Sequence, residues 1–171
     1  MEPPLPTVLV VGGSSGTGKA VARAAAESGA FRVVIAARSA ERLAAAAEIS
    51  NGAVETAVLD AADDAALAAF FAARGNGAFK HVAVTRRWRK RGRLSLRGQL
   101  GGRVEGKLFV QMAVAHPSAP LVANGGSITF VSGALAERPG KSSSVLASTN
   151  ATIDALGRAL AQTNNNPRSQ I

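Results

Sequence analysis

Short apolar runs alternate with amphipathic stretches along most of the chain, and glycine or proline separates many of them. Runs of this length predict strands that are buried on both faces. The runs lie at residues 7–12, 32–37, 54–59, 80–85 and 126–132. Apolar residues at helical spacing predict helices at residues 17–29, 40–49, 63–74, 104–115 and 142–162. This alternation predicts an α/β fold with a parallel sheet of about five strands and right-handed crossovers.

Local signals support several element ends. Gly29 is typical of a helix C-cap, and Ser39 of an N-cap. Pro117 and Pro120 are expected to end the helix over 104–115. Residues 1–162 are predicted to form one domain, and residues 163–171, which lack periodicity, a disordered tail.

The strongest motif is VVGGSSGTG at residues 10–18, where Gly12, Gly16 and Gly18 give the spacing G-x-x-x-G-x-G between a strand and a helix. Such a turn brings backbone N–H groups and a helix N-terminus close to a pyrophosphate. Hydroxyl donors nearby are Ser14, Ser15 and Thr17. We therefore predict a doubly wound Rossmann fold with strand order 3-2-1-4-5 and a dinucleotide in the crevice at strands 1 and 4.

A second interpretation of the same residues is a P-loop. Residues 13–20 (GSSGTGKA) nearly match G-x-x-x-x-G-K-[ST], with Lys19 for phosphates and Asp60 for magnesium. Ala20, however, replaces the hydroxyl that should bind the metal. The dinucleotide interpretation is favoured, and no metal site is expected.

Charge is concentrated in one segment. Nine of the twenty basic residues and one of the eleven acidic residues lie within 85–107. Residues 85–103 look like an atypical basic insertion. A solvated loop or a frame-shifted stretch is favoured over nucleic-acid binding through 86–103 and Trp88, and an anionic-substrate clamp ranks third.

The chain has no cysteine, no signal-peptide pattern and no apolar stretch long enough to span a bilayer. These features predict a cytoplasmic protein that does not bind a membrane.

Several segments together resemble the short-chain dehydrogenase/reductase family. They are the glycine loop VGGSSGTG, RVVIAARSAERL at 32–43, LDAADD at 59–64, GGSITFVSGALAERP at 125–139 and NATIDALGRALA at 150–161. The resemblance implies an oxidoreductase that acts on a carbonyl or alcohol of a small metabolite, and a homo-oligomer. It also implies that Asp60 contacts adenine and that Thr85 lies where the backbone passes close to the cofactor.

The second strand favours one cofactor. NAD enzymes place an acid at its end to bind the ribose 2′-hydroxyl, but this chain has Arg38 and Ser39 there. An arginine can pair with a 2′-phosphate, and a serine can donate to it. The predicted cofactor is NADP(H).

The catalytic pattern of the family is incomplete. Its tyrosine and lysine fall in register with Leu146 and Asn150, and its serine with Gly133, which leaves Ser132 as the candidate catalytic residue. Leucine cannot transfer a proton. The alternative to an active reductase is therefore a catalytically inactive nucleotide-binding relative, and the chain is expected to be C-terminally truncated.

Overall fold

A computed structural model of the chain describes residues 4–48, 54–85, 98, 101–102 and 104–163. Its core is a five-stranded sheet of order β3-β2-β1-β4-β5, as predicted, in which each neighbouring pair is parallel. The strands are β1 (Thr7–Val11), β2 (Arg32–Ala37), β3 (Val54–Val58), β4 (Phe79–Val84) and β5 (Val122–Phe130). The helices are α1 (Gly16–Glu27), α2 (Ala40–Ala47), α3 (Asp64–Ala72), α5 (Val110–Ser118) and α6 (Ser144–Thr163), with a π-helix η2 (Val104–Phe109) and 3-10 turns η3 (Ala119–Leu121) and η4 (Ala134–Ala136).

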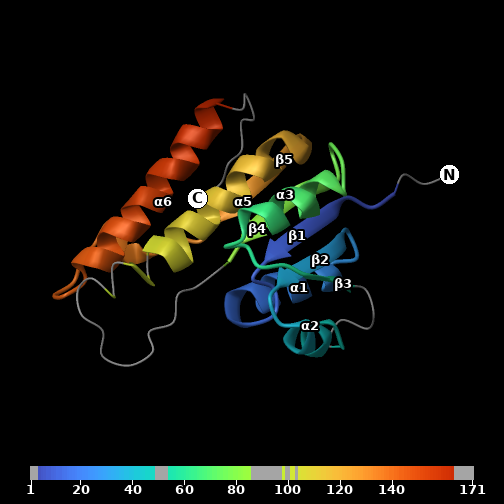
Figure 1. Cartoon of the computed structure of the whole chain (residues 1–171), viewed down its shortest axis with the longest axis horizontal. Helices are drawn as coiled ribbons and strands as arrows, with labels where there is room; N and C mark the ends of the chain where they lie inside the picture. Colours follow the sequence, from blue (N-terminus) through green and yellow to red (C-terminus); the bar gives the residue numbers. More distant parts are fainter. Residues whose placement is uncertain (1–3, 49–53, 86–97, 99–100, 103, 164–171) are drawn as a thin grey trace.

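The two faces of the sheet have separate helical covers (Figure 1). Along β1, Val8 and Val10 face the cluster that includes Ala22 of α1 and Leu43 of α2. The alternate residues Leu9 and Val11 face the larger cluster under α3, α5 and α6. Right-handed crossovers produce this division. The chain crosses the sheet from β1 to β3 toward one edge and from β4 to β5 toward the other edge, so the connecting helices lie on opposite faces.

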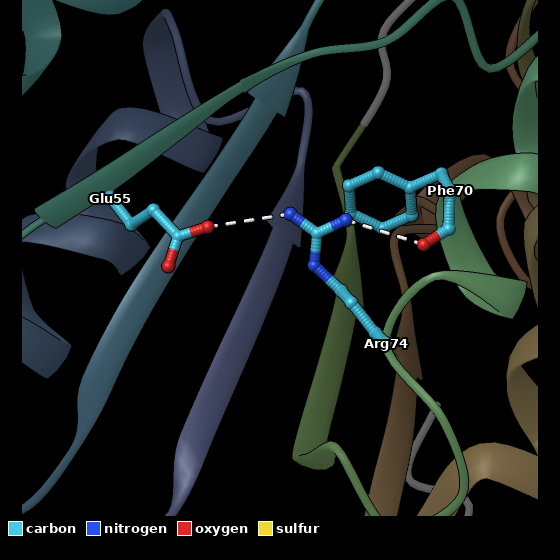
Figure 2. A network of polar contacts seen from close by, with 3 residues as sticks. All are labelled: Glu55, Phe70 and Arg74. Carbon is cyan, nitrogen blue, oxygen red and sulfur yellow. Dashed lines mark hydrogen bonds and ion pairs between the residues drawn. The ribbon is translucent and has the colours of Figure 1, made fainter.

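A network of polar contacts around Arg74 connects the edge strand β3 to α3 (Figure 2). The Arg74 guanidinium lies 3.8 Å above the Phe70 ring centroid and donates to the Phe70 carbonyl at 3.2 Å. It also donates to the Glu55 carboxylate at 3.3 Å. One planar cation thereby joins a strand and a helix without a buried partner charge.

The expected caps are present in part. Ser39 caps α2 by accepting from the Arg42 N–H at 3.2 Å, and Gly29 follows α1 with a φ of +67°. At α3 the capping residue is Asp63, which accepts from the Ala65 and Ala66 N–H groups at 3.0 Å.

The prediction that Pro117 ends the fourth helix is wrong. The segment begins as the π-helix η2, and α5 continues to Ser118 with Pro117 inside it. Pro117 lacks the N–H that would bond to the Ala113 carbonyl, but a proline in the last turn removes only this one donor. The turn continues because the Ala119 N–H and the Ser118 hydroxyl both donate to the Ala115 carbonyl, the hydroxyl at 3.2 Å, and only Pro120 lies outside, in η3.

Strand β5 differs from its predicted span at both ends. It starts four residues earlier because a bulge lies opposite Phe79–His81, where Lys80 donates to the Asn124 carbonyl at 2.6 Å. It ends at Phe130 because the Gln111 side chain takes over the next backbone groups: its Oε1 accepts from the Val131 N–H at 2.9 Å, and its Nε2 donates to the Val131 carbonyl at 3.3 Å.

Two predicted segments, the C-terminal tail and the basic insertion, lie mostly outside the described residues. Helix α6 includes Thr163, and residues 164–171 of the predicted tail lie outside the described residues. Most of the basic segment, including Trp88, also lies outside them.

Candidate functional site at the carboxyl edge of the sheet

The glycine loop joins β1 to α1 at the carboxyl edge of the sheet, which we define as the side where β1, β4 and β5 end. Gly12 and Gly16 have φ values of +90° and +54°, a region that side chains disfavour. Among the described residues, a Cβ at Gly16 would meet nothing within 4 Å, so none of them closes this part of the turn. At Gly13 a Cβ would lie 2.7 Å from the Ile35 side chain, so the turn also presses against β2. Sequence reasoning missed this last contact.

Gly18 and Thr85 fix how closely helix α1 approaches the strands. A Cβ at Gly18 would lie 2.3 Å from both the Gly12 carbonyl oxygen and the Thr85 Oγ1. Thr85 is itself held at the end of β1, because its N–H and its hydroxyl donate to the Val11 carbonyl at 2.9 and 3.0 Å. Thr85 therefore positions the loop, with its hydroxyl engaged by backbone.

The loop leaves polar groups accessible at the start of α1. Ser15 is the N-cap residue in extended conformation, and among the described residues its side chain makes no capping hydrogen bond to the helix. Ser15, Gly16 and Thr17 are exposed, and Ser14 is half-buried. An open positive-φ turn in front of an uncapped twelve-residue helix fits a bound pyrophosphate.

The end of β2 carries the residues predicted to select the cofactor. Arg38 is exposed and follows β2 directly, and the Ser39 hydroxyl oxygen already accepts the capping bond of α2. One strand further, the half-buried Asp60 accepts from the Ala62 N–H at 3.1 Å. The edge near β2 and β3 thus combines an exposed arginine with a serine and a carboxylate, groups that can bind a phosphorylated adenosine.

A polar cluster lies beyond β5, between η2 and α6. The Lys107 ammonium donates to the Ser132 carbonyl at 3.0 Å and to the Asn150 Oδ1 at 2.5 Å. The Asn150 amide donates to the Gly133 carbonyl at 3.3 Å, and the Ser132 hydroxyl donates to the Asn150 carbonyl at 3.1 Å. We call Lys107, Ser132, Gly133 and Asn150 the β5–α6 polar cluster. It joins three elements through both backbone and side chains.

This cluster explains the glycine that stands in the serine register. A Cβ at Gly133 would lie 2.8 Å from the Asn150 amide nitrogen, so a side chain at 133 would push Asn150 away. Gly133 and Asn150 are therefore coupled, and the Ser132 hydroxyl is engaged with backbone. Nearby hydroxyls on α6 are engaged in the same way, since Ser148 donates to the Ser144 carbonyl and Thr149 to the Val145 carbonyl.

Sequence reasoning missed Lys107 and Gln111 as members of this region. Lys107 is 8% exposed and Gln111 is fully buried. The signal was present in the sequence, because Lys107, Gln111, Val114 and Ser118 follow at intervals of four, three and four, which places polar residues on the core-facing stripe of a helix.

The two histidines do not form a catalytic or metal site with acidic residues in the described part of the chain. His81 Nδ1 lies 2.9 Å from the Ser127 Oγ, and its ring meets Phe31 edge-on at 5.6 Å. Within the described ranges, no three metal-ligating side chains gather. Within the same ranges, every helix is too short or too polar to cross a bilayer.

Comparison with known proteins gives a consistent result. The family model described as short chain dehydrogenase matches residues 6–81, from just before β1 into β4. The match contains the whole glycine loop, which favours the dinucleotide interpretation over the P-loop. A search of curated proteins found no match.

Solved structures share the fold. A short-chain dehydrogenase/reductase from Serratia marcescens is 25% identical, with a TM-score of 0.77, over 94% of this chain and 69% of that protein. A short-chain dehydrogenase from Streptomyces avermitilis is 22% identical, with a TM-score of 0.79, over 94% and 61%. A short-chain dehydrogenase/reductase from Burkholderia multivorans with bound NADP is 24% identical, with a TM-score of 0.75, over 95% and 74%.

The family match in the N-terminal half agrees with the strand order, the glycine loop and the likeness to these solved structures. Residues 6–81 are therefore similar to the short-chain dehydrogenase family, and the chain shares the fold of solved short-chain dehydrogenases/reductases.

Proposed function

We propose that the chain binds NADP(H) and transfers a hydride between this cofactor and a carbonyl or alcohol of a small metabolite. The observation that carries the proposal is the open glycine turn in front of α1, closed from behind by Gly18 and Thr85. Gly12, Gly16 and Gly18 shape this turn for the pyrophosphate. Donors at its opening would be Ser14, Ser15 and Thr17.

The preference for NADP(H) rests on the end of β2. Arg38 is exposed there, and the residues from Ala36 to Ser39 include no acid that would repel a 2′-phosphate. Ser39 keeps its proton to donate, because its cap uses the hydroxyl oxygen as acceptor. Asp60 would accept from the adenine amino group. The Burkholderia multivorans relative, which binds NADP, supports the same choice.

The catalytic residues match the pattern of the short-chain dehydrogenase/reductase family less fully than the cofactor-binding residues do. When bound, the nicotinamide would supply or accept the hydride. Ser132 would orient the substrate through its hydroxyl oxygen, since the hydroxyl proton is donated to the Asn150 carbonyl. The proposal includes a small-molecule substrate. It also includes assembly of the chain with further copies of itself as a homo-oligomer.

One observation favours a second function, that of a nucleotide-binding relative without catalysis. The chain contains no tyrosine, and Leu146 on α6 occupies the register of the family's proton donor. A screen of carbonyl substrates with NADPH, followed by absorbance at the reduced-cofactor band, separates the two. Turnover of any substrate supports the reductase, and cofactor binding without turnover supports the second function.

Calorimetric titration with NADPH and with NADH tests the cofactor proposal. We expect NADPH to bind more tightly, and Arg38→Ala to weaken NADPH binding by about ten- to a hundredfold while NADH binding stays unchanged. The matched control is Arg32→Ala, which removes an exposed arginine from the opposite end of the same strand and should change neither affinity. Equal binding of NADPH by the Arg38→Ala protein would contradict the proposal.

A further inference from the structure

The buried ammonium of Lys107 is a strong charge that the proposed function does not use. It lies on η2, a π-helical turn, and π-turns are frequent at functional sites. The Ser132 carbonyl and the Asn150 side chain, which accept two of its hydrogen bonds, are uncharged oxygens. These two bonds hold the side chain in place, and lysine is positively charged in its ordinary protonated form.

Its position follows from the strand order. Ser132 comes two residues after β5, so the bond from Lys107 to the Ser132 carbonyl brings the ammonium to the carboxyl edge on the β5 side. Arg38 and Asp60 lie on the β2–β3 side of the same edge. A dinucleotide in such a fold extends across the crevice from one side to the other. If its adenosine half is held by Arg38, its nicotinamide half is directed toward the side of Lys107.

The two redox forms of the cofactor differ in charge in that half. The oxidised nicotinamide ring is a cation, the reduced ring is neutral, and the phosphates are the same in both. A fixed ammonium on the nicotinamide side repels the oxidised ring and leaves the reduced ring unaffected. This repulsion is only weakly screened by salt when the charges are buried.

We propose that Lys107 is a specificity-determining residue that makes this chain bind NADPH more tightly than NADP⁺, and so favours the reductive direction. The proposal rests on NADP(H) binding as proposed above. Lys107 reaches this place because Gly133 leaves room for Asn150, whose side chain receives the ammonium. The other proposed cofactor residues do not distinguish the redox forms, because they contact parts that both forms share.

The test is the ratio of the Kd for NADP⁺ to the Kd for NADPH, measured by calorimetry on the full chain. In the unaltered protein this ratio should exceed one by several-fold. Lys107→Gln replaces the ammonium by a neutral amide that can still donate hydrogen bonds, and it should lower the ratio by about three- to tenfold. Lys107→Arg should keep the ratio. As a matched control, Lys80→Gln removes a lysine that also donates to a backbone carbonyl, at the amino end of β4, and should leave the ratio unchanged.

A second variant guards against misfolding of Lys107→Gln. Asn150→Asp places a carboxylate beside the ammonium with little change in shape, and it should lower the ratio in the same direction. A ratio of one or less in the unaltered protein, or an unchanged ratio in folded Lys107→Gln or Asn150→Asp, overturns the role of Lys107 while NADP(H) binding stands. If the unaltered protein binds neither form, the proposed function and this inference both fail.

Discussion

The glycine loop and the β5–α6 polar cluster lie on the same edge of one sheet but are built in different ways. The loop depends on backbone: Gly12 and Gly16 supply positive φ values, and Gly18 permits a close approach. The cluster depends on side chains that reach across from separate elements, Lys107 from η2 and Asn150 from α6.

The difference shows in how far each region keeps its family pattern. A backbone site tolerates few residue types, because glycine is strongly favoured at a positive φ and a close contact leaves no room for a Cβ. A site built from side chains can keep an ammonium at the same place in space even when the lysine that carries it lies on a different helix. In this chain an asparagine stands in the lysine register, and a lysine arrives from η2 to meet it. The loop should therefore be sensitive to volume, and the cluster to charge and pairing.

The largest expected effect comes from breaking the pairing in the cluster. Asn150→Lys places a second ammonium beside Lys107, and an uncompensated buried charge costs about 3–5 kcal/mol of the free energy of unfolding. Combining it with Lys107→Asn restores one ammonium and one amide in exchanged positions. We expect the double variant to regain more than half of the loss, as measured by urea denaturation.

If the double variant loses as much free energy of unfolding as the two single variants lose together, the lysine and the asparagine are not interchangeable. That result would make the cluster depend on element geometry, as the loop does, and would remove the contrast between the two regions.

A smaller loss is expected from volume in the loop. Gly18→Ala adds a Cβ at 2.3 Å from the Gly12 carbonyl oxygen and the Thr85 Oγ1. The clash should cost about 3 kcal/mol, and the helix propensity of alanine offsets about 1 kcal/mol of it. The net loss should be about 2 kcal/mol in chemical denaturation, with NADPH binding weakened at least tenfold.

Gly140→Ala is the matched control for this variant. Of the described residues, its Cβ would meet only the Leu135 side chain, at 3.9 Å, so stability and binding should stay close to those of the unaltered protein. Full stability of Gly18→Ala would mean that the loop has room that the structure does not show.

The comparison also explains what the sequence could predict. The strand order and the glycine turn were predicted because they follow from local signals, namely apolar runs, glycine spacing and caps such as Ser39. The bulge in β5 was not, because it depends on Lys80 meeting the Asn124 carbonyl across 44 positions of sequence. The continuation of α5 past Pro117 was not predicted either, because it depends on the Ser118 hydroxyl and the Ala119 N–H, which both donate to the Ala115 carbonyl.

The cluster could be predicted only as a set of departures from a pattern. Register alignment identified Gly133 and Asn150 as unusual, but their coupling is a contact between β5 and α6 that no spacing rule contains. Lys107 was counted with the basic segment. The π-turn shifts the helical phase around it, so a regular periodicity places it only approximately on the buried face.

The smallest expected effect is a pH dependence at the opposite end of the β4–β5 pair. Burial, and then the charge of Lys80, lowers the pKa of His81 below its ordinary value of 6.5. Ser127 lies at hydrogen-bond distance from the ring, and Phe31 packs edge-on against it. Below pH 6.5 the unfolded chain binds a proton that the folded protein resists. The stability contributed by His81 is therefore complete above pH 6.5 and is lost as the pH falls through the lowered pKa.

Thermal unfolding at pH 7.5 and 5.5 measures this loss. His81→Gln should make the decrease in Tm between the two values smaller, and Lys80→Gln should do so to a lesser extent because it removes only the second cause. If His81→Gln keeps the whole decrease, the pH dependence arises at other groups. If the decrease shrinks in that order, this end of β4–β5 also depends on side-chain charge, and the contrast with the backbone-built loop extends beyond the β5–α6 polar cluster.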